Sequence, residues 1–168
     1  MRRADASAGS AGSLHMRRLT ALLSLLIAAG CSATPPAELG VHQEQLATCP
    51  ASPNCVSSQT TDAQHRVEPL RYRGAAAPAW QALEETVKAL PRSSVVARDR
   101  GSYLQVELRS ALFRFVDDLE FLAVPEQHLI HLRAASRVGY WDLGVNRRRV
   151  EAIRQAFGER LAPENGAD

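Results

Sequence analysis

Hydrophobic and polar residues alternate most clearly between residues 103 and 136 of this 168-residue chain. Leu104, Val106 and Leu108 occupy one parity and polar residues the other, which is the pattern of a strand with one buried face. Three further apolar runs have the length of strands and are bounded by turn residues: 93–99, 119–124 and 128–134. Successive strands joined by short turns predict an antiparallel β-meander.

The alternation changes phase beyond Ser110, because the bulky residues Phe113 and Phe115 occupy the opposite parity. An extra residue in one strand has this effect, so we predict a bulge or bend at residues 110–111. Another short run, residues 65–73, contains Pro69 and therefore suits an edge strand or a bulge.

Two segments repeat apolar residues at helical spacing. The first begins near Pro78, ends at Pro91 and places an apolar stripe at Trp80, Leu83, Val87 and Leu90. The second follows Asn146, a suitable N-cap residue, and places its stripe at Val150, Ile153, Phe157 and Leu161. Two amphipathic helices and one meander predict an α+β fold, a two-layer sandwich. We assign it to a single domain, residues 49–163, followed by a disordered tail at 164–168.

Composition and charge narrow the classes of function. Apolar residues make up 45% of the chain, enough for a packed core. Four of the 20 basic residues and one of the 18 acidic residues lie in the first 30 positions, so the remainder carries 16 basic and 17 acidic groups. A near-neutral domain does not favour nucleic-acid binding. No motif indicates a cofactor, and His65, His128 and His131 lack the spacing of a helical metal pair, so we predict neither cofactor nor metal.

The N-terminal segment has the build of a secretory signal. Arg17 and Arg18 precede an apolar stretch of 11 residues, 19–29, which is too short for a membrane-spanning helix. Met16 is a credible true start, because residues 1–15 show no helix or strand pattern. We therefore predict a signal segment over residues 1–30.

The signal ends in AAGC, residues 28–31, which resembles a bacterial lipobox although Ala28 stands where that motif most often has Leu. Acyl chains such as palmitate on Cys31 predict stable attachment to a membrane. Ser32 fits sorting to the outer membrane, facing the periplasm of the cell envelope. The alternative is a plain signal peptide with Cys31 incidental. Residues 31–48 hold Pro35, Pro36 and no apolar periodicity, which predicts a lipid-anchored flexible tether.

Cys49 and Cys55 flank two prolines and Asn54, a composition typical of a turn. A tight turn in an exported chain favours a disulfide between them. Two structural thiols, or a metal or redox site, are the alternatives. The redox and metal interpretations lack a Cys-x-x-Cys motif and a second cysteine pair.

Several blocks of the sequence resemble a known family. CPASPNCVSS, HRVEPLRY, FRFVDDLEF and RAASRVGYWDLGVNRRRVEAIR occur in the order of the uncharacterised bacterial and plastid family called domain of unknown function 1499. The resemblance covers residues 46–157. It implies a single compact domain, often exported or membrane-tethered, and brings no reaction, cofactor or catalytic residue with it.

Charged and polar residues gather in the second half of the meander: Asp117, Asp118, Glu120, Arg133, Ser136, Arg137 and Asp142. If residues 113–124 and 128–136 pair about Pro125, Glu120 lies near Arg133. These residues could form structural ion pairs, or a pocket in which Arg133 and Arg137 bind an anionic group. An acid/base pair of aspartate and Glu120, or a metal bound by carboxylates, is also open.

Three functions follow from these observations. The first is a non-enzymatic envelope lipoprotein that binds a partner protein or a small anionic ligand near the membrane. The second is an envelope hydrolase that uses the carboxylates near 117–120. The third is a purely structural or assembly role.

Overall fold

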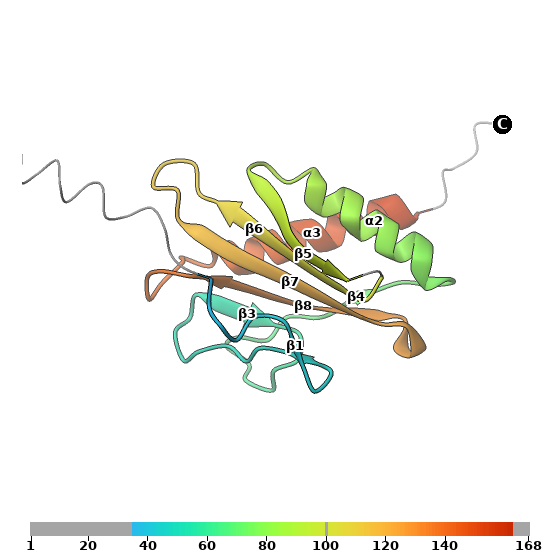
Figure 1. Cartoon of the computed structure of the whole chain (residues 1–168), viewed down its shortest axis with the longest axis horizontal. Helices are drawn as coiled ribbons and strands as arrows, with labels where there is room; N and C mark the ends of the chain where they lie inside the picture. Colours follow the sequence, from blue (N-terminus) through green and yellow to red (C-terminus); the bar gives the residue numbers. More distant parts are fainter. Residues whose placement is uncertain (1–34, 100, 163–168) are drawn as a thin grey trace, which may run out of the picture. The chain divides into compact units, whose positions relative to one another are not determined.

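The computed structural model describes residues 35–99 and 101–162, which form an antiparallel sheet with helices on one face (Figure 1). The predicted signal segment 1–30, the lipidation site Cys31 and the tail 164–168 lie outside the described residues. Within the described ranges, no helix is both long and apolar enough to cross a membrane.

The sheet contains the predicted meander of four sequential strands. Its strands are β3 (Cys55–Ser57), β4 (Leu70–Arg71), β5 (Ser93–Asp99), β6 (Tyr103–Arg109), β7 (Val116–Val124) and β8 (Leu129–Ser136). The order is β3-β8-β7-β6-β5, and β4 pairs with β8 beside β3 on the same edge. The short 3-10 helix η1 (Pro125–Gln127) makes the turn between β7 and β8. The run at 65–73 therefore contributes only a two-residue edge strand, because Pro69 cannot donate a ladder hydrogen bond.

Helices α2 (Ala76–Lys88) and α3 (Val145–Leu161) cover one face of this sheet (Figure 1). The apolar stripes predicted from the sequence are buried there, except that their last residues, Leu90 and Leu161, are half-buried. Alternate strand residues such as Leu119, Phe121 and Leu132 complete the core. The apolar side chains that repeat every 3.6 residues in the helices and every second residue in the strands thus pack in one core. The predicted α+β architecture is confirmed.

Of the bulge or bend predicted at residues 110–111, the bulge is wrong, and the chain turns there instead. Residues 110–115 connect β6 to β7, and the two strands stay in continuous register from Tyr103↔Leu122 to Arg109↔Val116. Within the connection, Phe115 N donates to Ser110 Oγ and Ser110 N donates to Phe115 O, each at 2.9 Å. The change of parity therefore marks a chain reversal. The register shift of this sheet lies instead in β5, between Val95 and Ala97.

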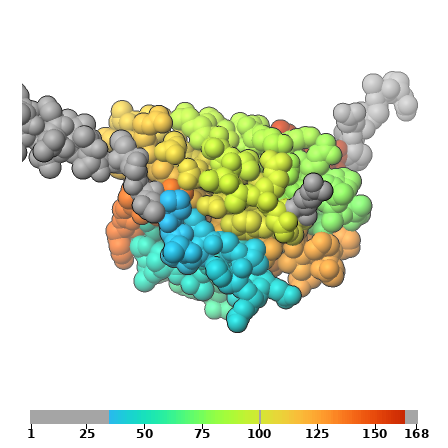
Figure 2. All heavy atoms as spheres, viewed as in Figure 1, coloured from blue at the N-terminus to red at the C-terminus, as the bar shows by residue number. Residues whose placement is uncertain are grey.

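The N-terminal segment covers the other face of the sheet. Strands β1 (Val41–His42) and β2 (Gln45–Leu46) form a hairpin, and Gly40 N donates a 2.7 Å hydrogen bond to Glu120 of β7. Figure 2 shows this segment, in blue, directly against the body of the domain. The structure thus differs from the tether predicted for 31–48 over residues 35–48. Gln43 and Glu44 take left-handed backbone angles at the turn, where sequence reasoning looks for Gly or Asn.

Candidate functional site

A row of charged side chains lies on the sheet face opposite the helices. Residues on alternating positions of a strand share a face, and the register pairs Glu107 with Asp118 and Glu120 with Arg133. Arg137 follows directly after β8 and joins this row. All five side chains are buried or nearly so, although three are carboxylates. Such burial requires that the charges be paired.

Arg137 binds two carboxylates. Its Nε and one terminal nitrogen donate to the two oxygens of Asp118, each at 2.7 Å, and that terminal nitrogen also donates to Glu107. Hydrogen bonds to Asp118, reinforced by Glu107, raise the pKa of Arg137 above its ordinary value. The guanidinium therefore stays charged and fastens the ends of β6, β7 and β8 together.

Glu120 is fully buried and accepts three hydrogen bonds. The donors are Arg133 Nη1 at 3.2 Å, the Tyr103 hydroxyl at 2.9 Å and Gly40 N at 2.7 Å. Burial and the nearby charge of Glu120 raise the pKa of Tyr103, so the phenol keeps its proton and remains a donor. Nε of Arg133 is buried and has no hydrogen-bond partner within the part of the chain that the structure describes.

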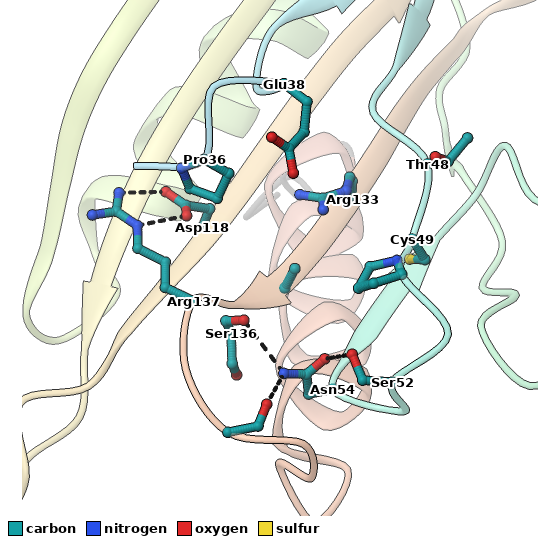
Figure 3. Close-up of a pocket in the computed structure, with 13 residues that line it drawn as sticks. Pro36, Glu38, Thr48, Cys49, Ser52, Asn54, Asp118, Arg133, Ser136 and Arg137 are labelled. Carbon is teal, nitrogen blue, oxygen red and sulfur yellow. Dashed lines mark hydrogen bonds and ion pairs between the residues drawn. The ribbon is translucent and has the colours of Figure 1, made fainter. Parts of the chain in front are cut away.

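A cavity of about 390 Å³ opens over Arg133, Asp118 and Arg137 (Figure 3). One wall comes from the N-terminal segment, with Pro36 and Glu38. The other walls come from the loop before β3 and from the end of β8, and their residues are Thr48, Cys49, Pro50, Ser52, Asn54, Ala135, Ser136 and Gly139. The cavity therefore joins a charged floor to walls that carry several hydroxyl and amide groups.

The loop that forms this wall is held by the predicted disulfide, which the structure confirms. Cys49 and Cys55 are bonded, with their Cα atoms 5.6 Å apart. Between them, Asn54 Nδ2 donates to Gly139 O at 2.6 Å, and Asn54 O accepts from Ser136 N. Asn54 thus fastens the disulfide loop to the residues that follow β8, so the two walls of the cavity are fixed relative to each other.

A second polar group lies on the helix side of the sheet. Arg149 of α3 donates to Asp117 Oδ2 at 2.9 Å and to Asn146 Oδ1 at 2.7 Å. Asn146, in turn, donates to Ser136 Oγ at 3.1 Å and to Asn54 O at 2.9 Å. This buried network connects α3 to the disulfide loop from the side opposite the charged row.

The cap of α3 differs from the prediction. Asn146 lies inside the first turn, and Asp142 instead accepts hydrogen bonds from Gly144 N and Asn146 N, each at 2.8 Å. A carboxylate at this end of a helix is favourable for the macrodipole. Asp142 thus occupies a structural position at the start of α3.

The seven predicted site residues therefore fall into two groups. Asp118, Glu120, Arg133 and Arg137 lie together at or beneath the cavity, whereas Asp117 and Asp142 lie in the helix-side contacts. Ser136 borders the cavity, but its hydroxyl accepts from Asn146. Sequence reasoning missed Glu107, Tyr103, Glu38 and Asn54. Glu107 lies on the polar parity of β6, which was the available signal.

The charged row differs in what its carboxylates and its guanidinium groups have left to bind. Each carboxylate of the charged row already accepts hydrogen bonds or pairs with arginine, whereas the Arg133 guanidinium has a donor left over. Across residues 35–99 and 101–162, no three His, Cys, Asp or Glu side chains are grouped so as to hold a metal ion. Residues 45–157 match the model of a family described as Protein of unknown function (DUF1499). A comparison with curated proteins gave no match.

Proposed function

Because this chain belongs to the family of proteins of unknown function DUF1499, whose description names no activity, we propose a function from its sequence and site. The protein is a lipid-anchored protein of the bacterial cell envelope. Its domain is a non-enzymatic binding module that takes a small ligand with an anionic group at Arg133. The buried Arg133 donor beside the cavity carries the proposal.

The anchor is supported by the sequence before residue 35. Arg17, Arg18 and the apolar stretch 19–29 lead to a lipobox-like AAGC that ends at Cys31. Acylation of this cysteine places the domain at a membrane, and Ser32 favours the outer membrane facing the periplasm. Labelling of cells with palmitate tests the anchor directly. If a Cys31→Ser chain still takes up the label, the proposed lipid anchor on Cys31 is wrong.

The ligand class follows from Arg133. A guanidinium has five donors, and a buried donor without an acceptor costs about 1–3 kcal/mol. Glu120 takes one of these donors, and the Nε donor has no described partner. An oxygen of a carboxylate or phosphate group is the acceptor that suits a guanidinium best. Because Nε itself is covered in the fold, a ligand in the cavity reaches it only when the Arg133 side chain turns, and this contact then relieves a cost already present.

The cavity sets the size and polarity of the ligand. Its volume of about 390 Å³ is in the range of small-molecule sites. Thr48 and Ser52 bring hydroxyl groups to the wall, while Pro36 and Pro50 bring apolar surface. Glu38 carries a carboxylate into the same cavity (Figure 3), so it repels an anion bound at Arg133. The site therefore favours small ligands with one anionic group.

A hydrolase that uses the carboxylates near 117–120 has less support. Asp118 accepts two hydrogen bonds from Arg137, and Glu120 accepts three from other groups. Asp117 pairs with Arg149 on the opposite face of the sheet. A general base needs a free lone pair toward the substrate, and these contacts occupy the oxygens.

Binding is tested by following arginine side-chain NH signals in the NMR spectrum of the full chain in detergent micelles. We expect inorganic phosphate or acetate to shift the Arg133 signal saturably. Arg154, whose Nε donates to Glu151 away from the cavity, provides the internal control and stays unchanged. Glu38→Gln removes the repulsive charge and tightens binding about fivefold, the equivalent of ~1 kcal/mol between charges in water.

The competing outcome is equally clear. If neither anion shifts the Arg133 signal, while the spectrum shows a folded domain, the ligand proposal fails and the charged row is a structural ion-pair network. Thr48→Val distinguishes a change in the cavity from a change in the ion pairs. Thr48 borders the cavity, whereas the ion pairs of the charged row are formed by other residues. We expect this variant to weaken binding and to leave the melting temperature unchanged.

A further inference from the structure

Exposed hydrophobic side chains concentrate at one end of the sheet. Ten large hydrophobic side chains are exposed among the described residues, and eight of them lie in the β6–β7 and β8–α3 connections or at the first residue of α3. These eight are Leu112, Phe113, Phe115, Val138, Tyr140, Trp141, Leu143 and Val145. Single exposed apolar residues are ordinary, but a cluster of this size marks an interaction surface. We call residues 112–115 and 138–145 the apolar end.

The two connections form one surface. β6 ends, β7 begins and β8 ends at the same end of the antiparallel sheet, where α3 also begins (Figure 1). A cavity of about 330 Å³ is lined from both sides, by Phe115 of the first connection and by Val138 and Trp141 of the second. Arg137 N also donates to Val116 O, which joins the bases of the two connections. The apolar end is therefore continuous.

The exposure is maintained against local preferences. Leu143 is 78% exposed and holds a left-handed backbone conformation with φ of 54°. Such a conformation is unfavourable for a bulky residue and tends to persist at functional sites. Trp141 and its neighbour in the sequence, Tyr140, are 68% and 67% exposed. Exposure of these apolar side chains to water is unfavourable, so their grouping on one surface indicates a binding partner.

The composition of the apolar end matches a membrane interface. Trp and Tyr favour the boundary between lipid chains and head groups, and Leu and Phe favour the chains beneath it. Arg114 and Arg148 are exposed within or beside the two connections, where they suit anionic head groups. The acidic residue of these connections, Asp142, is already bound to the start of α3. The exposed arginines and the apolar side chains thus both favour a membrane with anionic head groups as the partner of this surface.

The position of the chain entry supports this occupant. Pro36 lines a cavity together with Arg137 and Gly139, so the described chain begins beside the β8–α3 connection. Three residues separate Cys31 from Pro35, so the four Cα–Cα steps between them span at most ~14 Å. With the anchor proposed above, a step that rests on the proposed function, the lipid is tied by this short linker to Pro35, where the described chain begins. We propose that the apolar end inserts into the bilayer interface and docks the domain on the membrane.

Quenching of tryptophan emission by brominated lipids tests the docking. The full chain is reconstituted in phosphatidylethanolamine/phosphatidylglycerol vesicles with bromine on the acyl chains. Of the two tryptophans, Trp80 is buried in the core, so it serves as the internal reference. We expect strong quenching in the wild-type chain and loss of that quenching in Trp141→Phe. Flotation of the same vesicles reports attachment separately.

A pair of matched double variants identifies the surface. Phe113→Ser/Leu143→Ser should lose the quenching of Trp141. Val41→Ser/Val96→Ser should retain it, because it alters the two large hydrophobic residues that are exposed outside the apolar end in the described part of the chain. If the chain floats and Trp141 is not quenched, docking is overturned while the anchor stands. Quenching of Trp141 in a Cys31→Ser chain supports docking, because the contact then forms without the anchor. Shielding of Trp141 that depends on protein concentration and not on lipid assigns the surface to a second copy of the chain and overturns docking.

Discussion

Replacement of Arg133 by methionine tests how the charged row is stabilised. In the folded protein the side chains of Arg133 and Glu120 are 5% and 0% exposed and form a 3.2 Å ion pair. Arg133→Met leaves the Glu120 carboxylate buried without its guanidinium. Removal of one partner of a buried pair costs about 3–5 kcal/mol. In a domain of this size that corresponds to a fall in melting temperature of roughly 10–20 °C.

A surface pair and a double variant provide the controls. Arg66 and Glu68 are 57% and 61% exposed and 3.7 Å apart, so Arg66→Met should cost less than about 1 kcal/mol. Adding Glu120→Gln to Arg133→Met removes the buried charge and keeps an acceptor for Gly40 N and the Tyr103 hydroxyl. We expect the double variant to recover at least about half of the lost stability.

Urea unfolding measures these differences, provided that the slope of the transition is the same for all variants. The reasoning is refuted if Arg133→Met costs no more than Arg66→Met. It is also refuted if the double variant is less stable than Arg133→Met, because the buried charge would then not be the source of the loss.

Three further predictions concern single contacts. Cys49→Ser/Cys55→Ser opens the seven-residue disulfide loop and should lower the free energy of unfolding by about 2 kcal/mol in urea. Asp142→Ala removes the acceptor of Gly144 N and Asn146 N at the start of α3 and should cost about 1 kcal/mol, whereas Asp142→Asn, which keeps an acceptor, should cost less. Burial lowers the pKa of His131, so the unfolded chain takes up a proton first as the pH falls below about 6.5. Wild-type stability should therefore fall between pH 7.5 and 5.5 more than that of His131→Asn, and equal slopes would contradict the assignment.

The elements of the core could be predicted from the sequence because their signals are local. Alternation at Leu104, Val106 and Leu108, and the stripe from Val150 to Phe157, record which side of each element is buried. The pairing of Glu120 with Arg133 followed from the turn at Pro125. The same alternation could have separated Asp117 from Asp118, since neighbours in a strand point to opposite faces.

The rest depended on contacts that no local pattern contains. Residues 35–48 have the composition of a spacer, and their structure comes from contacts such as Gly40 with Glu120, 80 residues apart. Asn54 is likewise a turn residue in the sequence and a connection between loop, strand and helix in the structure. The cavity exists only where these distant segments meet, so its residues could not all be predicted.

The long sequence separation at the charged row has a consequence for the order of folding. The N-terminal segment is synthesised first, but Glu120 of β7, which accepts from Gly40 N, is made 80 residues later. Closing so long a loop is slow compared with forming the β6–β7 and β7–β8 hairpins. The carboxylates of the charged row therefore remain hydrated until the meander is complete. The N-terminal segment covers them in the last step. Pulsed hydrogen exchange during refolding should show protection of Leu119, which lies between β6 and β8, before protection of Gly40. Simultaneous protection would rule out this order.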